Sequence, residues 1–262
     1  WSLEDYMLIG KGTVIGHLME CAGQVTGGYF AEPGKKEVKG LENLGFPLVV
    51  VKLDGTAIIS KVEHTGGLVN LQTVKEQLRY EVVNPYAYLT PDVSADFSTI
   101  RIEEIGKDQV QVSYGGGNPK PEKLKVSVGY KAYFKGEGEI SYAGTGAVER
   151  AKLASNILKA RLTDKFPEMQ LDLIGLNALH GDNFHQSLVP YEVRLRISAK
   201  AKSKEEAMLI GEEVEALYTN GPAGGGGVRK TVDEVIGIVS VLMDRKDIEI
   251  ETVGLRPGEK LH

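Results

Sequence analysis

The 262-residue sequence predicts an α+β fold in two parts. We expect a β-rich region with N-terminal helices over residues 1–143, and a two-layer α/β sandwich with an antiparallel sheet over residues 144–262. Three observations lead to this prediction. Residues 46–64 form two β-rich runs joined by an Asp-Gly turn, "YEVRLRISAKA" alternates apolar and polar residues, and amphipathic helical patterns lie on both sides of that run.

The first part begins with one or two helices over residues 2–22, where Gly10 and Gly12 weaken the middle. Residues 70–83 have helical spacing, and Pro85 ends that helix. Three β-rich runs follow, at residues 98–105, 108–114 and 123–143, and these predict an antiparallel meander.

The second part shows the order helix, strand, strand, helix, strand, strand. These elements are expected at residues 146–166, 169–176, 191–201, 204–218, 234–243 and 248–255. Ser203 is placed to cap the second helix, with Glu206 at the capping-box position. We therefore predict one antiparallel sheet over residues 147–253 with both helices on one face.

The composition limits the possible partners and compartments. A net charge of −5 lacks the basic excess of a nucleic-acid-binding protein, and no apolar run approaches the roughly 18 residues of a membrane span. The single cysteine, Cys21, rules out an intrachain disulfide framework and fits a reducing cytoplasm. Because Trp1 stands directly before a capped helix, we expect a missing N-terminal half, as the same chain or a separate subunit, and an oligomer.

Two Thr-Gly-Gly turns are candidate anion-binding sites. Thr26-Gly27-Gly28 follows Glu20 and Gln24, while Thr65-Gly66-Gly67 follows His64 and precedes a helix, whose N-terminus attracts anions. We expect the two turns to frame one site, with Glu20 and His64 as acid–base candidates and Gln24 as a ligand contact. The alternative is two ordinary tight turns and a structural histidine.

Cys21 is a further candidate nucleophile. His17 lies four residues earlier and therefore on the same helical face. The alternative is an inert cysteine near a helix end that behaves as a small hydrophobic residue.

The segment "LNALHGDNFHQ", residues 176–186, is the densest polar cluster. His180 and Asp182 are predicted as an acid–base pair, with Asn177 as a ligand contact. A metal held by His180, Asp182 and His185 is an alternative, but the spacing matches no standard ligand pattern, so no metal is predicted. A polar loop without chemistry is the other alternative. No cofactor can be named from the sequence.

The segment "YTNGPAGGGGVRK" contains four consecutive glycines. Consecutive glycine N–H groups form anion-binding nests, and basic residues add charge. The expected ligand contacts are Asn220, Gly224, Gly225, Gly226, Gly227, Arg229 and Lys230, facing the "NALHGDN" loop at residues 177–183. Neither a P-loop nor a dinucleotide fingerprint is present. A mobile linker is the alternative.

Four segments together resemble the acyclic terpene utilisation family, AtuA. They are "GHLMECAGQVTGGYF", "GGLVNLQTVKEQLRYEVVNPYAYLTPDVSADF", "YEVRLR" and "LYTNGPAGGGGVRK". The resemblance implies a catabolic protein for branched terpenoid acids handled as CoA esters, with a further N-terminal region before the segment seen here.

Two functions are compatible with this resemblance. One is a lyase of hydratase type that acts on a branched acyl-CoA or a small polycarboxylic acid. The other is a non-catalytic subunit that binds an acyl-CoA or organises a carboxylic-acid degradation complex. Either would bind a small anionic substrate.

Overall fold

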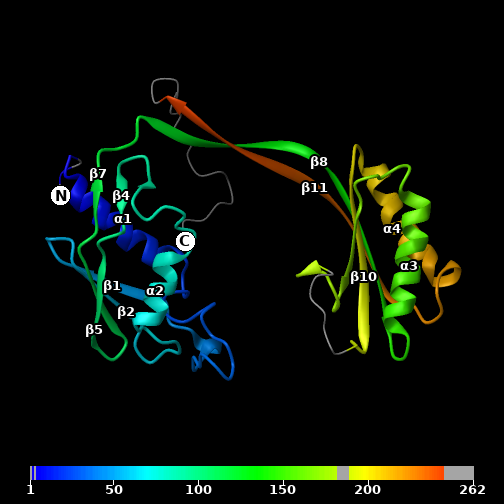
Figure 1. The fold of residues 1–262 in the computed structure, drawn as a ribbon, viewed down its shortest axis with the longest axis horizontal. Coiled ribbons are helices and arrows are strands. Elements are labelled where there is room, and N and C mark those ends of the chain that lie inside the picture. The colour runs from blue at the N-terminus through cyan, green and yellow to red at the C-terminus, as the bar shows by residue number, and fades with distance from the viewer. Residues whose placement is uncertain (1, 3, 182–188, 245–262) are drawn as a thin grey trace. The chain divides into compact units, whose positions relative to one another are not determined.

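A computed structural model describes residues 2, 4–181 and 189–244 (Figure 1). The chain forms two compact units. The first comprises residues 1–125 together with the chain from residue 242, and the second comprises residues 126–241. Each unit has its own hydrophobic core. The helices and the antiparallel sheets confirm the predicted α+β fold.

The described part of the first unit contains two antiparallel sheets and two α-helices. One sheet has the order β1-β2-β6-β5 and the other the order β3-β4-β7. The elements are α1 (Tyr6–Glu20), the 3₁₀ helix η1 (Leu41–Asn43), β1 (Pro47–Val51), β2 (Ala57–Lys61), α2 (Leu71–Arg79), β3 (Tyr88–Leu89), β4 (Ser94–Asp96), β5 (Arg101–Gly106), β6 (Gln109–Ser113) and β7 (Gly116–Asn118). The predicted hairpin is confirmed as β1 and β2, which pair from Pro47↔Lys61 to Val51↔Ala57.

α1 is a single helix despite its glycines. A Cβ added to Gly10 would overlap the carbonyl group of Gly116, so the glycine lets α1 lie directly against β7. Val14 and Leu18 of α1 then pack with Ile59 and Val110 of the first sheet in one buried cluster. The glycine therefore serves a close helix–strand contact, which outweighs its low helix propensity.

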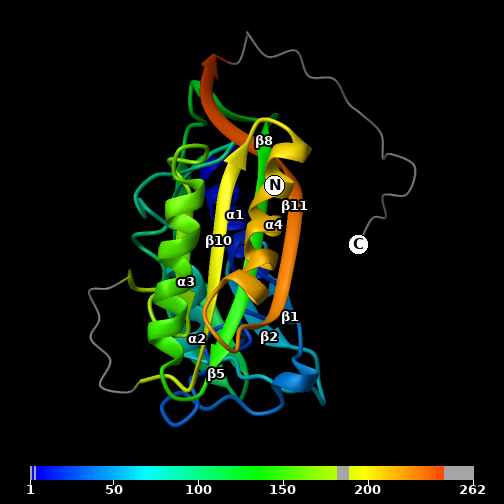
Figure 2. The same ribbon diagram turned by 90° about the vertical axis from the view of Figure 1, so that its right-hand side faces the viewer.

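The second unit is a four-stranded sheet with the order β11-β8-β10-β9. Its elements are β8 (Lys123–Ala143), α3 (Ala147–Leu162), β9 (Gln170–Ile174), β10 (Glu192–Ala201), α4 (Lys204–Asn220) and β11 (Gly226–Asp244). β10 pairs antiparallel with both β8 and β9, and β11 runs opposite to β8 (Figure 1). Figure 2 shows α3 and α4 on the same face of this sheet, as predicted.

The alternation predicted for β10 is confirmed by burial. Val193, Leu195 and Ile197 are at most 1% exposed and face the helices. Ser203 caps α4 by accepting a hydrogen bond from the N–H of Glu206. The helix layer and the alternating strand thus form the core that the sequence pattern indicated.

β8 differs from its expected place. Residues 123–143 were expected in the meander of the first region, but β8 pairs with β10 from Phe134↔Ala201 to Ala143↔Glu192. Ile140 and Tyr142 of β8 are fully buried in the core of the second unit. The units therefore divide at residues 125 and 126, whereas the expected boundary at residues 143 and 144 coincides with the end of β8. The strand expected at residues 248–255 lies outside the described residues.

Candidate functional site

A polar pocket of about 680 Å³ opens at the N-terminus of α2 in the first unit. Four segments contribute to it: the loop before η1, the end of β2, the turn at residues 65–70 and the β5–β6 turn. Its lining includes Lys39, Gly40, Lys61, Thr65, Gly66, Gly67, Asn70, Glu104, Lys107 and Asp108. The second Thr-Gly-Gly turn is therefore part of this pocket, which makes it the leading candidate site.

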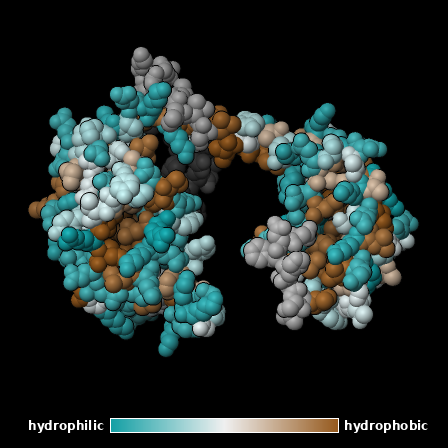
Figure 3. Space-filling model, viewed as in Figure 1, coloured by the Kyte–Doolittle hydropathy of each residue, from teal (hydrophilic) through white to brown (hydrophobic). Residues whose placement is uncertain are grey.

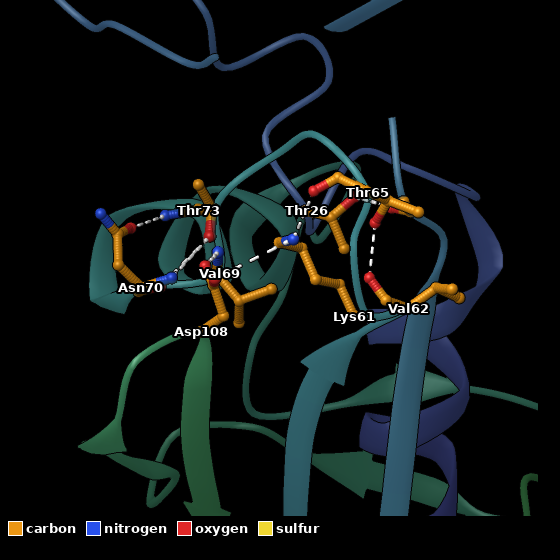
Figure 4. A network of polar contacts seen from close by, with 9 residues as sticks. Thr26, Lys61, Val62, Thr65, Val69, Asn70, Thr73 and Asp108 are labelled. Atoms are coloured by element: carbon orange, nitrogen blue, oxygen red, sulfur yellow. Dashed lines mark hydrogen bonds and ion pairs between the residues drawn. The ribbon is translucent and has the colours of Figure 1, made fainter. Parts of the chain in front are cut away.

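Lys61 and Asp108 form a largely buried pair in this pocket (Figure 4). Lys61 Nζ donates to the carbonyl oxygen of Thr65 at 2.8 Å and lies 3.9 Å from Asp108 Oδ2. The Lys61 and Asp108 side chains are 10% and 21% exposed. Asp108 Oδ1 also accepts the N–H of Val69 at 3.0 Å. The pair brings a cation and a carboxylate together at fixed positions.

The N-terminus of α2 already has anionic partners from the chain itself. Asn70 is the N-cap in a complete capping box with Thr73, and the N–H of Leu71 donates to Glu104 Oε1 at 2.8 Å. These groups, with Asp108 on Val69, satisfy the N–H groups that attract anions at a helix start. An anionic ligand in this pocket would instead meet the exposed ammonium groups of Lys39 and Lys107.

The two Thr-Gly-Gly turns, expected to frame one site, lie side by side, but their N–H groups bond within the chain. The N–H of Leu68 donates to the carbonyl of Thr26 at 2.8 Å, and those of Gly66 and Gly67 donate to Asn43 and Lys39 at 2.8 and 2.9 Å. Thr26 is fully buried, and neither it nor Gly27 and Gly28 lines the pocket. Backbone-to-backbone contact, rather than a free nest of N–H groups, accounts for these glycines.

His64 and Glu20 lie elsewhere. His64 is exposed, has a positive φ of 59° and is not among the residues that line the pocket. Glu20 ends α1, where its Oε1 lies 3.0 Å from Nδ1 of the buried His17. The Nε2 atom of His17 lies 2.8 Å from the carbonyl oxygen of Gln77. Both ring nitrogens of His17 thus lie within hydrogen-bond distance of an oxygen atom.

Cys21 follows this histidine–carboxylate pair and is half-buried. Burial raises the pKa of the nearby Tyr88 phenol, and Glu20, Glu81 and Cys21 raise it further. Glu20 and Glu81 therefore place negative charge around the Tyr88 phenol. Gln24 has a buried Nε2 atom without a hydrogen-bond partner among the described residues and lies outside the 680 Å³ pocket.

The polar cluster after β9 is partly described. Asn177 closes the end of β9, since its Oδ1 accepts the N–H of Leu173 at 2.9 Å. His180 is exposed in the following turn. Asp182 and His185 lie outside the described residues, so the His180–Asp182 acid–base pair stays a prediction.

The glycine run forms a defined turn between α4 and β11. Gly224 and Gly227 have positive φ values of 72° and 63°, and a Cβ on Gly225 would lie 2.8 Å from Ile140 Cδ1. Arg150 of α3 holds the turn by donating to the carbonyl oxygen of Ala223 at 2.9 Å and to that of Ala143 at 2.7 Å. The positive φ values of Gly224 and Gly227 and the close approach of Gly225 to the core explain three of the four glycines without a mobile linker.

The turn and the loop after β9 share one end of the sheet, because β9 ends where β11 begins. They stand at opposite edges, roughly 14 Å apart at three strand spacings. Arg229 and Lys230 do not act as one charged pair. Lys230 Nζ pairs with Glu215 of α4. Arg229 and Lys230 both line a separate pocket of about 230 Å³, together with Glu137 and Glu139. Asn220 is the exposed last residue of α4.

Three pocket residues, Lys61, Glu104 and Asp108, have little or no signal in the sequence. Asp108 is recognisable only as a turn residue, and nothing marks Lys61 or Glu104. Their partners are distant, since Val69 bonds Asp108 across 39 residues and Leu71 bonds Glu104 across 33. The one available signal was the position of Asp108, a polar residue in the tight turn after β5, where binding residues often lie.

The described part of the chain contains neither a metal-binding cluster of side chains nor a membrane-spanning helix. No three His, Cys, Asp or Glu side chains in it converge on a point suited to a metal ion. Within the same residues, no helix combines the length and apolarity required to cross a membrane.

Comparison with known proteins identifies the family. The family model described as acyclic terpene utilisation family protein AtuA matches residues 1–253, most of the 262-residue chain. No curated protein and no solved structure shows a detectable match. The match extends over both units, and the chain belongs to the acyclic terpene utilisation family AtuA.

Proposed function

We propose that this protein acts in acyclic terpene catabolism as a lyase of hydratase type, on a branched acyl-CoA or a small polycarboxylic acid. The family membership supports the catabolic role. The single observation that carries the reaction type is the Lys61–Asp108 pair inside a 680 Å³ pocket that also presents Lys39 and Lys107. A proton acceptor, a proton donor and cations for an anionic substrate are thereby gathered in one place.

In this proposal each group has a defined task. Dehydration of a 3-hydroxyacyl thioester removes a proton from the α-carbon and a hydroxyl group from the β-carbon, leaving a carbon–carbon double bond and water. The Asp108 carboxylate accepts the α-proton, and the Lys61 ammonium gives a proton to the departing hydroxyl. Lys39 and Lys107 bind the phosphates of CoA or a substrate carboxylate. The same groups in reverse add water.

A non-catalytic acyl-CoA-binding or assembly subunit is the second candidate. One observation favours it: Lys61 and Asp108 are already engaged, Lys61 with the carbonyl of Thr65 and Asp108 with the N–H of Val69. Side chains fixed in this way suit binding, while catalysis requires Lys61 to exchange its carbonyl partner for the substrate.

The test is turnover by the full chain. Branched 3-hydroxyacyl-CoA and enoyl-CoA pairs and tricarboxylic acids are offered, and formation or loss of the conjugated double bond is followed by absorbance. Asp108→Asn should lower kcat by about 10²–10⁴-fold and leave substrate affinity nearly unchanged. Asn tolerates the positive φ of 53° at this position. Asp92→Asn, at an exposed position, is the matched control.

The results separate the two candidates. Binding of acyl-CoA without turnover supports the non-catalytic subunit. Turnover that survives Asp108→Asn removes Asp108 from the chemistry, and absence of both binding and turnover contradicts both candidates.

A further inference from the structure

A second, amphipathic groove runs along α2 in the first unit. Leu78 of α2, Phe97 and Ile100 of the β4–β5 connection, and Ile102 of β5 line a cavity of about 250 Å³, and Pro85 lies at its margin. Phe97 is 7% exposed, and Leu78, Ile100 and Ile102 pack against the core. The groove therefore has an apolar floor that belongs to the hydrophobic core.

The floor is held in a defined shape. The N–H of Phe97 donates to the carbonyl oxygen of Pro85 at 2.7 Å, and the N–H of Ile100 donates to that of Phe97 at 3.3 Å. The Phe97 ring meets His17 edge-on, with centroids 5.6 Å apart. His17 is itself held by Glu20 and Gln77. A preformed apolar surface of this kind binds a ligand with little reorganisation.

Two cations stand at the rim of the groove. Lys75 and Arg79 both line it, and both are exposed. They lie one turn apart on α2, roughly 6 Å along the helix axis. Neither side chain has an ion-pair or hydrogen-bond partner among the described residues, although Glu76 lies on the same helix. Two unpaired cations beside an apolar floor are complementary to an anionic head with an aliphatic tail.

We propose that this groove binds an aliphatic carboxylate, with its tail on Phe97 and Ile100 and its carboxylate between Lys75 and Arg79. The volume of about 250 Å³ is below the usual range of about 300–1,000 Å³ for ligand pockets, which favours a short chain. The groove is distinct from the Lys61–Asp108 pocket, which lies at the opposite end of α2, and the proposal does not rest on the proposed reaction.

The experiment is a binding titration of the full chain with octanoate, acetate and octanol, without any thioester or turnover. Octanoate should bind more tightly than acetate, by about fourfold for each CH₂ that becomes buried. Octanol should bind at least tenfold more weakly than octanoate, because it lacks the charge that the two cations recognise.

The matched variants locate the site. Lys75→Gln with Arg79→Gln should weaken octanoate binding by tenfold or more and leave octanol binding unchanged, since glutamine keeps helix propensity. Lys52→Gln with Lys120→Gln removes the same charge from exposed positions outside the groove and should leave octanoate affinity nearly unchanged. Equal losses in the two double variants, equal affinity for octanoate and octanol, or no octanoate binding would each overturn the proposal.

Discussion

Gly66 illustrates how closely the backbone of the first unit approaches itself. A Cβ on this residue would overlap the carbonyl group of Gly40, and the N–H of Gly66 donates to the carbonyl of Asn43. On α1, by contrast, a Cβ on Gly16 would have no atom within 4 Å. The two glycines therefore have different physical roles.

Gly66→Ala should lower the free energy of unfolding by about 2 kcal/mol or more, because backbone atoms cannot rotate away as a side chain can. Gly16→Ala should be neutral or stabilising by up to about 1 kcal/mol, since alanine is the better helix former. Urea unfolding of both variants measures the difference. Similar effects in the two variants would contradict the close contact at Gly66.

Asp172 on β9 forms an ion pair with Arg196, the residue opposite it on β10. Burial tends to raise the pKa of this carboxyl, but hydrogen bonds from Gln170 and Arg196 and the charge of Arg196 outweigh it, so the pKa is lowered from 3.8. Arg196 Nη2 lies 2.9 Å from Asp172 Oδ2. The ionised carboxylate is therefore the form that the folded state prefers.

Asp172→Asn should lower stability by about 1 kcal/mol at neutral pH, the size expected for a partly exposed ion pair. Because the folded pKa lies below the unfolded one, the stabilisation is fully present above pH 3.8 and is lost as the pH falls through the folded pKa. Chemical unfolding of wild type and variant across the acid range should show the two curves converging. Asp164→Asn, at an exposed position, is the control and should give no such convergence.

At the level of elements, the connection between α4 and β11 depends on its backbone conformation. Gly224 has a positive φ, and a Cβ there would lie 2.8 Å from Arg150 Nη1. Gly226 has open space and no positive φ. The connection thus offers two glycines, separated by one residue, with opposite requirements.

Gly224→Ala should destabilise the protein by about 1 kcal/mol or more, whereas Gly226→Ala should change stability by less than that. Thermal unfolding measures the difference, and phosphate binding is titrated in parallel. Lost stability with unchanged phosphate binding supports a structural turn. Lost phosphate binding with an intact fold would support the anion site that the glycine run suggests.

At the level of the whole molecule, the paired strands β8 and β11 expose apolar side chains, several of which appear in brown in Figure 3. Ile236, Ile238 and Val239 on β11 are 60%, 73% and 46% exposed, and Tyr130 on β8 is 50% exposed. β11 is also an edge strand of its sheet, and no charged residue occurs from residue 235 to residue 243. Long apolar edge strands without charges promote strand pairing between chains.

We therefore expect the 28.4 kDa chain to self-associate through β11. Light scattering should give a mass above that of the monomer, and Ile236→Lys with Ile238→Lys should shift it toward the monomer. Val83→Lys with Leu179→Lys changes residues that are 98% and 91% exposed elsewhere and should leave the mass unaltered. A wild-type protein that stays monomeric at every concentration would contradict the expectation.

The sequence by itself determined the local elements and the family. The alternation of β10, the Asp54-Gly55 hairpin and the Ser203 cap each depend on residues within one element, so short-range patterns suffice to predict them. Thr65 to Gly67, which line the 680 Å³ pocket, were candidate site residues for the same reason, since glycine turns before a helix have a local signature.

Only the tertiary structure decided which elements meet. It placed β8 beside β10, brought Lys61 to Asp108, and joined His17 to Gln77 across 60 residues. It also showed that the glycine N–H groups donate to carbonyls of distant segments. Such contacts depend on the packing of whole faces, and a strand's own pattern specifies that it has a buried face without specifying the strand that will pair with it.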